Sequence, residues 1–359
     1  MRYSSSRSRR RCPFGAALLS VVLAAACDYE PTSPRPTVEP NPLPTFATAA
    51  AEGGTWVGRA PMPRGRVNLG AGVIPNARGV TIFYVIGGQN LRGDATTNVV
   101  HAYNPLLNSW ATKARLPDDR VFPNGAGAIN GKLYLTGGYD GATPTSDLGF
   151  TRRTLFVYDP ATNTWVQKKL MPVSSAGGVT GVINGRLYVL TGVKYECQDC
   201  PTVTTRSLYR YNPATDTWTK LASAPNPHAG GVGGVINGKF YVAGGGGELE
   251  GPPDRRLHVY NPATNTWSSK APMPLRDRGP GITGAVVAEK LYVTGGGSSA
   301  VDAYDPANDT WTRQTDVPDP ARWDQAAGTI KDFRGNQQMI VVGAADQNFG
   351  PGETWIYTP

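Results

Sequence analysis

The chain has 359 residues, of which 44 are glycine, 31 are proline and only 17% are charged. This composition is typical of turn-rich β structure and excludes a long helical protein. Five of the 35 basic residues and none of the 27 acidic ones lie within residues 1–26, so the rest of the chain is close to neutral, with no basic run that would indicate nucleic-acid binding.

Residues 1–26 are predicted to be an export signal. Arginines from Arg2 to Arg11 precede an apolar run, Phe14 to Ala26, that is too short to span a membrane comfortably. The run ends in small residues directly before Cys27, which resembles the lipobox of bacterial lipoproteins, although Ala24 stands where that family prefers leucine. We expect Cys27 to be lipidated. The protein is then an outer-membrane lipoprotein of the cell envelope, facing the periplasm or the cell surface; the alternative is a plain signal peptide cut nearby.

Residues 27–54 are predicted to be a linker. Six prolines between Pro31 and Pro44, with no apolar periodicity around them, cannot bury a core. An extended linker of this kind holds the globular part away from the bilayer, and the lipid anchor is the only membrane contact that the sequence predicts.

Two cysteines remain after Cys12, which lies in the signal, and Cys27. Cys197 and Cys200 are predicted to form a local disulfide in an oxidising compartment. A redox-active pair is the alternative, but the strand and helix context of such motifs is missing. A zinc site needs more ligands than this pair supplies, so we predict no metal site and no cofactor.

An eight-residue motif recurs through the chain after residue 55. It runs from Tyr158 to Trp165 with the sequence Tyr-Asp-Pro-Ala-Thr-Asn-Thr-Trp, which is turn chemistry between two aromatic residues. Each copy therefore predicts a hairpin with an aromatic anchor on both arms. The other copies run Tyr103–Trp110, Tyr211–Trp218, Tyr260–Trp267 and Tyr304–Trp311.

A second hairpin is predicted before each copy of this motif. In the second repeat, Gly125–Ile129 leads through Asn130-Gly131, a strong two-residue turn signal, into Lys132–Thr136 and the pair Gly137-Gly138. The corresponding turns of the first and last repeats, 75–79 and 331–336, are longer, so we expect those repeats to carry protruding loops.

The repeats are spaced for four short strands each. Successive tryptophans from Trp56 to Trp311 are 54, 55, 53, 49 and 44 residues apart. Together with the glycine pair and the Tyr-Asx-Pro hairpin, this spacing resembles the kelch family, whose repeats are the blades of a β-propeller. We therefore predict an all-β, six-bladed kelch-type β-propeller over residues 55–359. The chain stops after a third strand, so the strand around Trp56 is predicted to complete blade six and close the ring.

The long loops 141–154, 194–206 and 247–256 are predicted to share one face of the propeller, where we expect function. In each repeat, a polar residue lies shortly before the first strand, and its side chain could point at the mouth of the central channel on that face. The set comprises Arg66, Arg120, Ser175, His228, Arg278 and Arg322. We predict that the four arginines and His228 bind a ligand, because a guanidinium pairs with a carboxylate through two parallel bonds. The alternative is that each arginine bonds loop carbonyls of neighbouring blades, as is frequent in kelch repeats.

The candidates for catalysis are few. His101 and His258 occupy a position that sister repeats fill mostly with aromatic residues, so we assign them to packing. The copper site of galactose oxidase, a relative with a kelch-like propeller, has no counterpart here. The periplasmic sialic-acid mutarotase, a six-bladed kelch propeller, suits the arginine set, but its catalytic residues have no one-to-one match. We predict a ligand- or protein-binding module whose partner is an envelope protein or an acidic sugar or peptide. The alternative is a mutarotase or epimerase of an anionic sugar.

Overall fold

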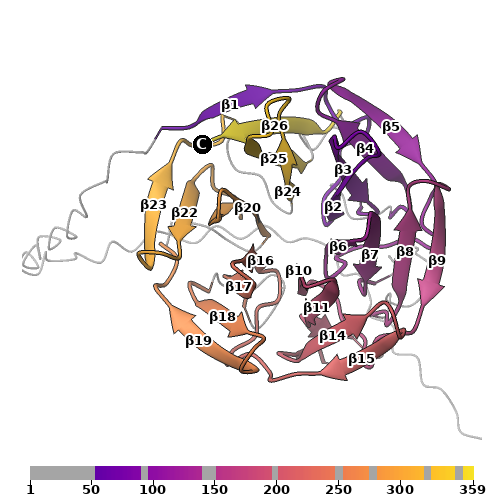
Figure 1. Cartoon of the computed structure of the whole chain (residues 1–359), viewed down its shortest axis with the longest axis vertical. Coiled ribbons are helices and arrows are strands. Elements are labelled where there is room, and N and C mark those ends of the chain that lie inside the picture. The colour runs from indigo at the N-terminus through magenta and orange to yellow at the C-terminus, as the bar shows by residue number, and fades with distance from the viewer. Residues whose placement is uncertain are drawn as a thin grey trace, which may run out of the picture. The chain divides into compact units, whose positions relative to one another are not determined.

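The computed structural model describes residues 53–89, 96–139, 151–195, 201–246, 254–274, 281–318, 325–343 and 351–359. These residues form strands and turns, arranged as six four-stranded antiparallel sheets around a common axis (Figure 1). The predicted signal, the linker up to residue 52, Cys27, Cys197 and Cys200 lie outside the described residues. Within those residues, no helix is long and apolar enough to cross a membrane.

Each sheet is one blade, and its strands are given from the axis outward. Blade 1 holds β2 (Gly70–Pro75), β3 (Thr81–Ile86), β4 (Val100–Asn104) and β5 (Ser109–Lys113). Blade 2 holds β6 (Ala126–Ile129), β7 (Lys132–Thr136), β8 (Leu155–Asp159) and β9 (Thr164–Lys168). Blade 3 holds β10 (Val179–Ile183), β11 (Arg186–Leu190), β14 (Leu208–Asn212) and β15 (Thr217–Lys220).

The other three blades follow the same plan. Blade 4 holds β16 (Val232–Ile236), β17 (Lys239–Ala243), β18 (Leu257–Asn261) and β19 (Thr266–Lys270). Blade 5 holds β20 (Ile282–Val287), β21 (Lys290–Gly295), β22 (Val301–Asp305) and β23 (Thr310–Gln314). Blade 6 holds β24 (Ala326–Lys331), β25 (Gln337–Gly343), β26 (Glu353–Thr358) and β1 (Thr55–Gly58). A small extra sheet, β12 (Val193–Lys194) with β13 (Val203–Thr204), projects from blade 3.

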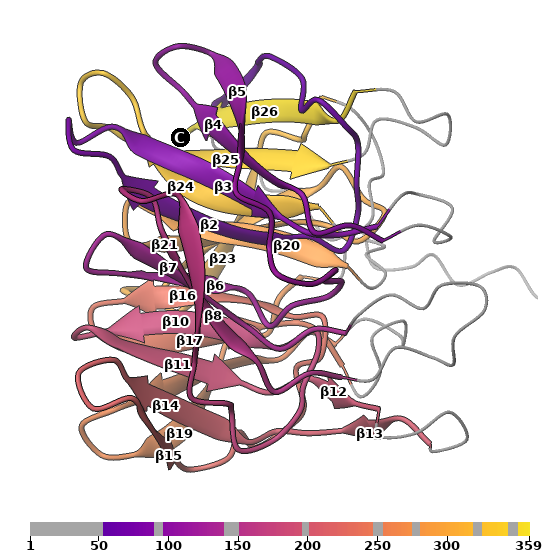
Figure 2. The same cartoon turned by 90° about the vertical axis from the view of Figure 1, so that its right-hand side faces the viewer.

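The connections of the blades lie on two opposite faces. The turns between first and second strands and between third and fourth strands share one face, which we call the turn face. The connections between second and third strands and between blades share the other, the loop face. In Figure 2 the loop face lies to the right, where β12 and β13 project.

The predicted turn signals form the hairpins expected of them. Asn130 and Gly131 both have positive φ, 49° and 74°, as a two-residue turn between twisted strands requires. The glycine pair that follows the second strand is needed for close packing between blades. A Cβ on Gly87 would lie 2.3 Å from the carbonyl oxygen of Arg120 in the next blade, so a side chain there would hold the blades apart.

The Tyr-Asx-Trp motif joins neighbouring blades as well as forming a turn. The Oδ1 atom of Asn163 accepts hydrogen bonds from the Tyr158 hydroxyl at 2.7 Å and from the Ala114 backbone N–H of blade 1 at 2.9 Å. The indole N–H of Trp165 donates to the Ala114 carbonyl at 2.9 Å. We call this set of three bonds the Asx latch, and it recurs at the other seams with an intact hairpin.

The ring closes as predicted, through the N-terminal strand. β1 pairs with β26 from Thr55 opposite Thr358 to Gly58 opposite Trp355. This seam has no Asx residue, because blade 6 has no covalent hairpin there. Instead, the Tyr357 hydroxyl donates to the Gln314 side chain at 3.0 Å, and the Trp56 indole donates to the Thr315 carbonyl at 2.9 Å. Blade 5 therefore supplies the acceptor that the missing hairpin would have provided.

Candidate binding site

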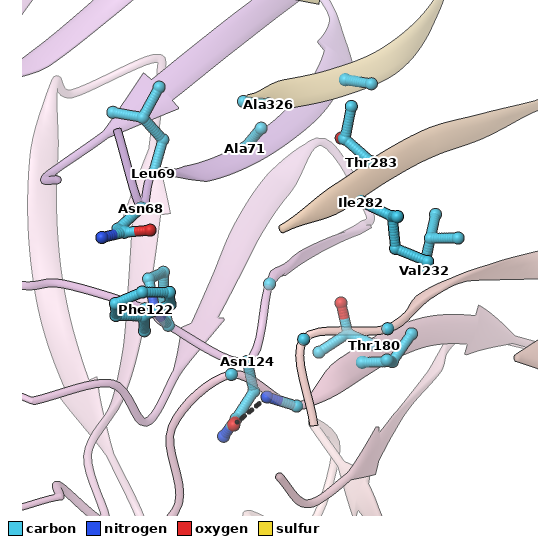
Figure 3. A pocket seen from close by; sticks show the side chains of 18 of the residues that line it. Asn68, Leu69, Ala71, Phe122, Asn124, Thr180, Val232, Ile282, Thr283 and Ala326 are labelled. Carbon is cyan, nitrogen blue, oxygen red and sulfur yellow. Dashed lines mark hydrogen bonds between the residues drawn. The ribbon is translucent and has the colours of Figure 1, made fainter. Parts of the chain in front are cut away.

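A pocket of about 240 Å³ opens on the propeller axis at the loop face. All six inner strands begin around it, and the side chains labelled in Figure 3 come from every blade and lie about the opening. Small residues dominate the lining because six inner strands converge there, and blades 3 and 4 contribute several glycines. The pocket is thus shaped by the main chain more than by large side chains.

The polar groups of the lining are uncharged. They are the amides of Asn68, Asn124 and Gln325 and the hydroxyls of Thr180 and Thr283. Within the described part of the chain, no lining residue carries a carboxylate, amine, guanidinium, imidazole or thiol. These lining residues therefore offer hydrogen-bond donors and acceptors, but neither a general acid or base nor metal ligands.

Asn124 is the deepest of these amides, with no exposed surface. Its Oδ1 atom accepts bonds from the Ser175 hydroxyl and from the Gly178 backbone N–H, each at 2.9 Å, and Figure 3 shows the second of these. Its Nδ2 group is buried and donates to no acceptor within the described residues. One amide donor in the pocket wall is therefore left over.

A chain of backbone hydrogen bonds runs along the mouth of the pocket from blade 1 to blade 4. Phe122 N–H donates to the Asn68 carbonyl at 3.0 Å, Gly177 N–H to the Phe122 carbonyl at 2.7 Å, and Gly230 N–H to the Gly177 carbonyl at 2.8 Å. The four residues come from blades 1 to 4, and all have positive φ, between 46° and 69°. We call these four residues the mouth ring; its geometry suits glycine, which blades 3 and 4 use.

Phe122 departs from this glycine rule. A bulky side chain at positive φ is a backbone outlier that costs about 1–3 kcal/mol, and such outliers cluster at functional sites. The Phe122 ring stacks on Tyr139 with 5.6 Å between centroids, and Tyr139 meets Tyr195 edge to face at 6.4 Å. All three rings are partly buried. These three residues form what we call the aromatic ledge, which runs outward from the pocket over blades 2 and 3.

The aromatic ledge is held by backbone contacts. Thr151 pairs with Tyr139 through a β-bridge, and its hydroxyl both donates to the Tyr195 carbonyl at 3.0 Å and accepts the Tyr195 N–H at 3.1 Å. Blades 2 and 3 are therefore tied together beneath the rings. A ledge fixed in this way loses little conformational entropy when a ligand settles on it.

Arg66, one of the predicted ligand-binding residues, is buried and bonded inside the protein. Its guanidinium donates to the carbonyls of Gly87 and Val99 and lies 3.1 Å from the His101 Nδ1 atom. Burial, with a smaller contribution from Arg64, lowers the pKa of Arg66 to about 10. Arg66 therefore bonds loop carbonyls, as in the alternative to ligand binding given in the sequence analysis.

Arg120 is also buried, but its bonding is incomplete. Its Nη2 atom contacts both carboxylate oxygens of Asp118, and its guanidinium carbon lies 5.8 Å from the centre of the Phe156 ring. The Nε and Nη1 groups have no acceptor among the described residues. Anion binding at Arg120 therefore stays a prediction. Arg278 and Arg322 lie outside the described residues, so the convergence of the five residues stays a prediction as well.

His228 belongs to a buried histidine pair. Its Nδ1 atom lies 2.6 Å from the Gly244 carbonyl oxygen, so it carries the proton, and its Nε2 atom lies 2.7 Å from the Nδ1 atom of His258. Burial lowers the pKa of both imidazoles, that of His228 to about 4. His101 in blade 1 and His258 in blade 4 thus each contact the loop residue of their own blade, Arg66 and His228, which agrees with the packing role expected for them.

Sequence reasoning missed the mouth ring and the aromatic ledge. Phe122 stands out only when the repeats are aligned with one another, because Gly177 and Gly230 fill the same position in the next two repeats. The contact of Tyr139 with Tyr195 spans two blades, and no local pattern marks it.

Comparisons with known proteins agree on the repeat type. The model of the KLHDC2/KLHL20/DRC7 Kelch-repeats domain matches residues 77–296, more than half of the chain. Kelch-like protein 35 of Mus musculus is 24% identical over 277 residues, 77% of this chain and 44% of its own length. Kelch-like protein terF of Aspergillus terreus is 29% identical over 248 residues, 65% of this chain and 52% of its own length. The chain thus spans about half the length of these curated relatives.

A solved structure shares the fold. The structure of YjhT superposes with a TM-score of 0.62 at 16% identity, covering 81% of this chain and 99% of that one. At this identity the match bears on architecture alone, and it agrees with the six blades described above. The repeat motifs, the six closed blades and the family match together lead to one conclusion: the chain belongs to the kelch-repeat family.

Proposed function

We propose that the protein is an exported, lipid-anchored binding module whose loop face holds a partner protein over the axial pocket. Kelch-repeat propellers typically bind proteins. Export and anchoring rest on the sequence of residues 1–26 and on Cys27. The binding surface comprises the aromatic ledge and the uncharged mouth of the pocket beside it.

One observation carries this proposal more than the others. Blade 2 places a phenylalanine at φ 46° in a position of the mouth ring that blades 3 and 4 fill with glycine. Glycine would be the more stable choice for this backbone conformation. The backbone conformation therefore does not favour phenylalanine at this position, and a half-buried aromatic ring at a pocket mouth is a typical anchor for a partner.

The partner that this surface favours is uncharged where it meets the pocket, which differs from the acidic partner expected from sequence. The Arg66 guanidinium donates hydrogen bonds to backbone carbonyls, and the described residues that line the pocket carry no charge. An apolar or aromatic side chain on the ledge, with neighbouring main-chain groups bonded to the pocket amides, satisfies both parts of the surface.

The pocket lining also favours a second candidate, a small uncharged sugar. Amides and hydroxyls both donate and accept, as sugar hydroxyls require. The anionic-sugar enzyme has less support, because its acid and base have no counterpart in the described lining. A thermal-shift panel of neutral and acidic sugars separates these cases, since a bound ligand raises the melting temperature.

Replacing Phe122 with glycine tests the proposal, because the change suits the backbone and copies the neighbouring blades. Wild-type protein and Phe122→Gly are immobilised and used to capture detergent-solubilised envelope proteins. We expect a partner retained by the wild type to be lost or weakened by roughly 2 kcal/mol in the variant, a typical cost for truncating an aromatic anchor. The melting temperature should change little, because relieved strain offsets lost packing.

The control is Phe333→Ser, which removes an exposed aromatic ring from the opposite face. It should retain every partner that the wild type retains. If Phe122→Gly captures the same proteins as the wild type but unfolds at a much lower temperature, Phe122 is a packing residue and the proposed surface is wrong.

A further inference from the structure

The exposed apolar side chains of the turn face gather in two adjacent blades. Leu106 and Leu107, in the β4–β5 turn of blade 1, are 50% and 72% exposed, and Phe333, in the β24–β25 turn of blade 6, is 78% exposed. The β8–β9, β14–β15 and β18–β19 turns carry Ala-Thr where blade 1 has its leucines, and the β22–β23 turn carries Ala-Asn. Single exposed apolar residues are ordinary, but three in the turns of two adjacent blades on one face form a group.

The turn that carries Phe333 is held rigidly in this exposed form. The Asp332 carboxylate accepts bonds from the backbone N–H groups of Arg334 and Asn336, each at 2.8 Å, and from the Asn336 side chain at 2.9 Å. Gly335, at φ 88°, lets the turn close. Phe333 is therefore exposed to solvent at the tip of a turn that is fixed by hydrogen bonds.

Basic side chains accompany these apolar tips. Arg78, Lys331 and Arg334 are exposed, and the guanidinium of Arg334 lies 5.1 Å from the centre of the Phe333 ring. The Lys331 N–H donates to the Thr81 hydroxyl at 2.7 Å, which joins the β24–β25 turn of blade 6 to the β2–β3 turn of blade 1. The carboxylate of Asp332 accepts hydrogen bonds from residues of its own turn. Apolar tips flanked by arginine and lysine suit an anionic lipid interface.

The chain also enters the propeller on this face. β1 begins beside the end of β26, where the other blades have their turn-face hairpin, and Gly54 is held there by its carbonyl, which accepts a 2.8 Å bond from the Thr315 hydroxyl. Residues 28–54 reach at most roughly 3 Å per residue when extended. Such a linker joins the propeller on the turn face, and its length lets that face of blade 6 reach the bilayer.

We propose that the turn face of blades 6 and 1, with Phe333, Leu106, Leu107 and the basic residues beside them, rests on an anionic lipid surface. The proposal draws on the proposed lipid anchor for its orientation. Its chemistry does not depend on that anchor, since the apolar tips and the basic residues belong to the propeller itself. Docked in this way, the propeller presents the axial pocket and the aromatic ledge away from the membrane.

Vesicle sedimentation of a chain that cannot be lipidated tests this proposal. The protein from residue 27 onward, carrying Cys27→Ser, is mixed with phosphatidylcholine vesicles with or without phosphatidylglycerol. We expect it to sediment with the phosphatidylglycerol vesicles and to be released by high salt. Phe333→Ser, and separately the double variant Leu106→Ala/Leu107→Thr that copies the sister turns, should each lower the partition coefficient about tenfold.

The matched control is Val203→Ser, which removes an exposed apolar residue of β13 on the loop face and should bind as the parent chain does. Absence of sedimentation, equal binding by all variants, or a dimer in solution that the same variants abolish would each overturn the proposal. Failure of the lipid anchor would show separately, as a missing lipid mass on Cys27 in protein isolated from cells.

Discussion

At the scale of single residues, the repeats differ in the polar side chains that they bury. His228 and His258 are 1% and 3% exposed, and the bond of the His228 Nδ1–H to the Gly244 carbonyl leaves the Nε2 atom as the acceptor for His258. His101 is held beside the Arg66 guanidinium. In each case burial, before any neighbouring charge, favours the neutral imidazole.

These histidines make stability depend on pH in a definite direction. Burial lowers the pKa of His101 and of His228 from 6.5 to about 4 each. The unfolded chain therefore binds more protons below about pH 6.5, and stability that is complete above that pH is lost as the pH falls toward 4. Urea melts at pH 7 and pH 5 should show a fall in the free energy of unfolding, which His228→Gln reduces. A melting midpoint that does not change over this range would contradict the neutral pair.

At the scale of elements, the Tyr-Asx-Trp hairpin explains why the repeat could be found by sequence alone. Its residues lie within eight positions, and the Asx side chain bonds its own tyrosine and the previous blade. Local turn chemistry and blade docking thus use the same residues. Phe122 gave no such signal, because its role depends on a backbone conformation and on rings from two blades. The burial of Arg66 could not be predicted either, since its acceptors are carbonyls that any residue type would supply.

The Asx latch should be worth measurable stability at each seam. Asn163→Gly keeps the left-handed backbone at φ 53° but removes the acceptor of Tyr158 and Ala114. We expect the free energy of unfolding to fall by roughly 1–3 kcal/mol in a urea melt, because a buried hydroxyl loses its partner. Asn163→Asp, which keeps the acceptor and copies Asp216 of the next blade, should cost much less. Equal stability of all three proteins would show that the latch bonds contribute nothing.

At the scale of the whole molecule, the sequence predicted the number of blades and the closing strand, since a chain that ends after a third strand needs a fourth from elsewhere. The side-chain contacts that join blades 5 and 6 were not predicted. Gln314 lies where blades 1, 2 and 4 have lysine and blade 3 has Leu221, and it is buried because it accepts a hydrogen bond from the Tyr357 hydroxyl. Closure also places the entry of the chain on the turn face, opposite the pocket, so that the two faces of the propeller are free for different contacts.

Hydroxyl-radical footprinting of the propeller with and without a captured partner tests the division of the two faces most directly. Oxidation is followed by mass spectrometry at Phe122, Tyr139 and Tyr195 on the loop face and at Phe333 on the turn face. The partner should protect the three rings of the aromatic ledge and leave the oxidation rate of Phe333 unchanged. Protection of Phe333 with no change on the ledge would place the partner on the wrong face and contradict the proposed binding surface.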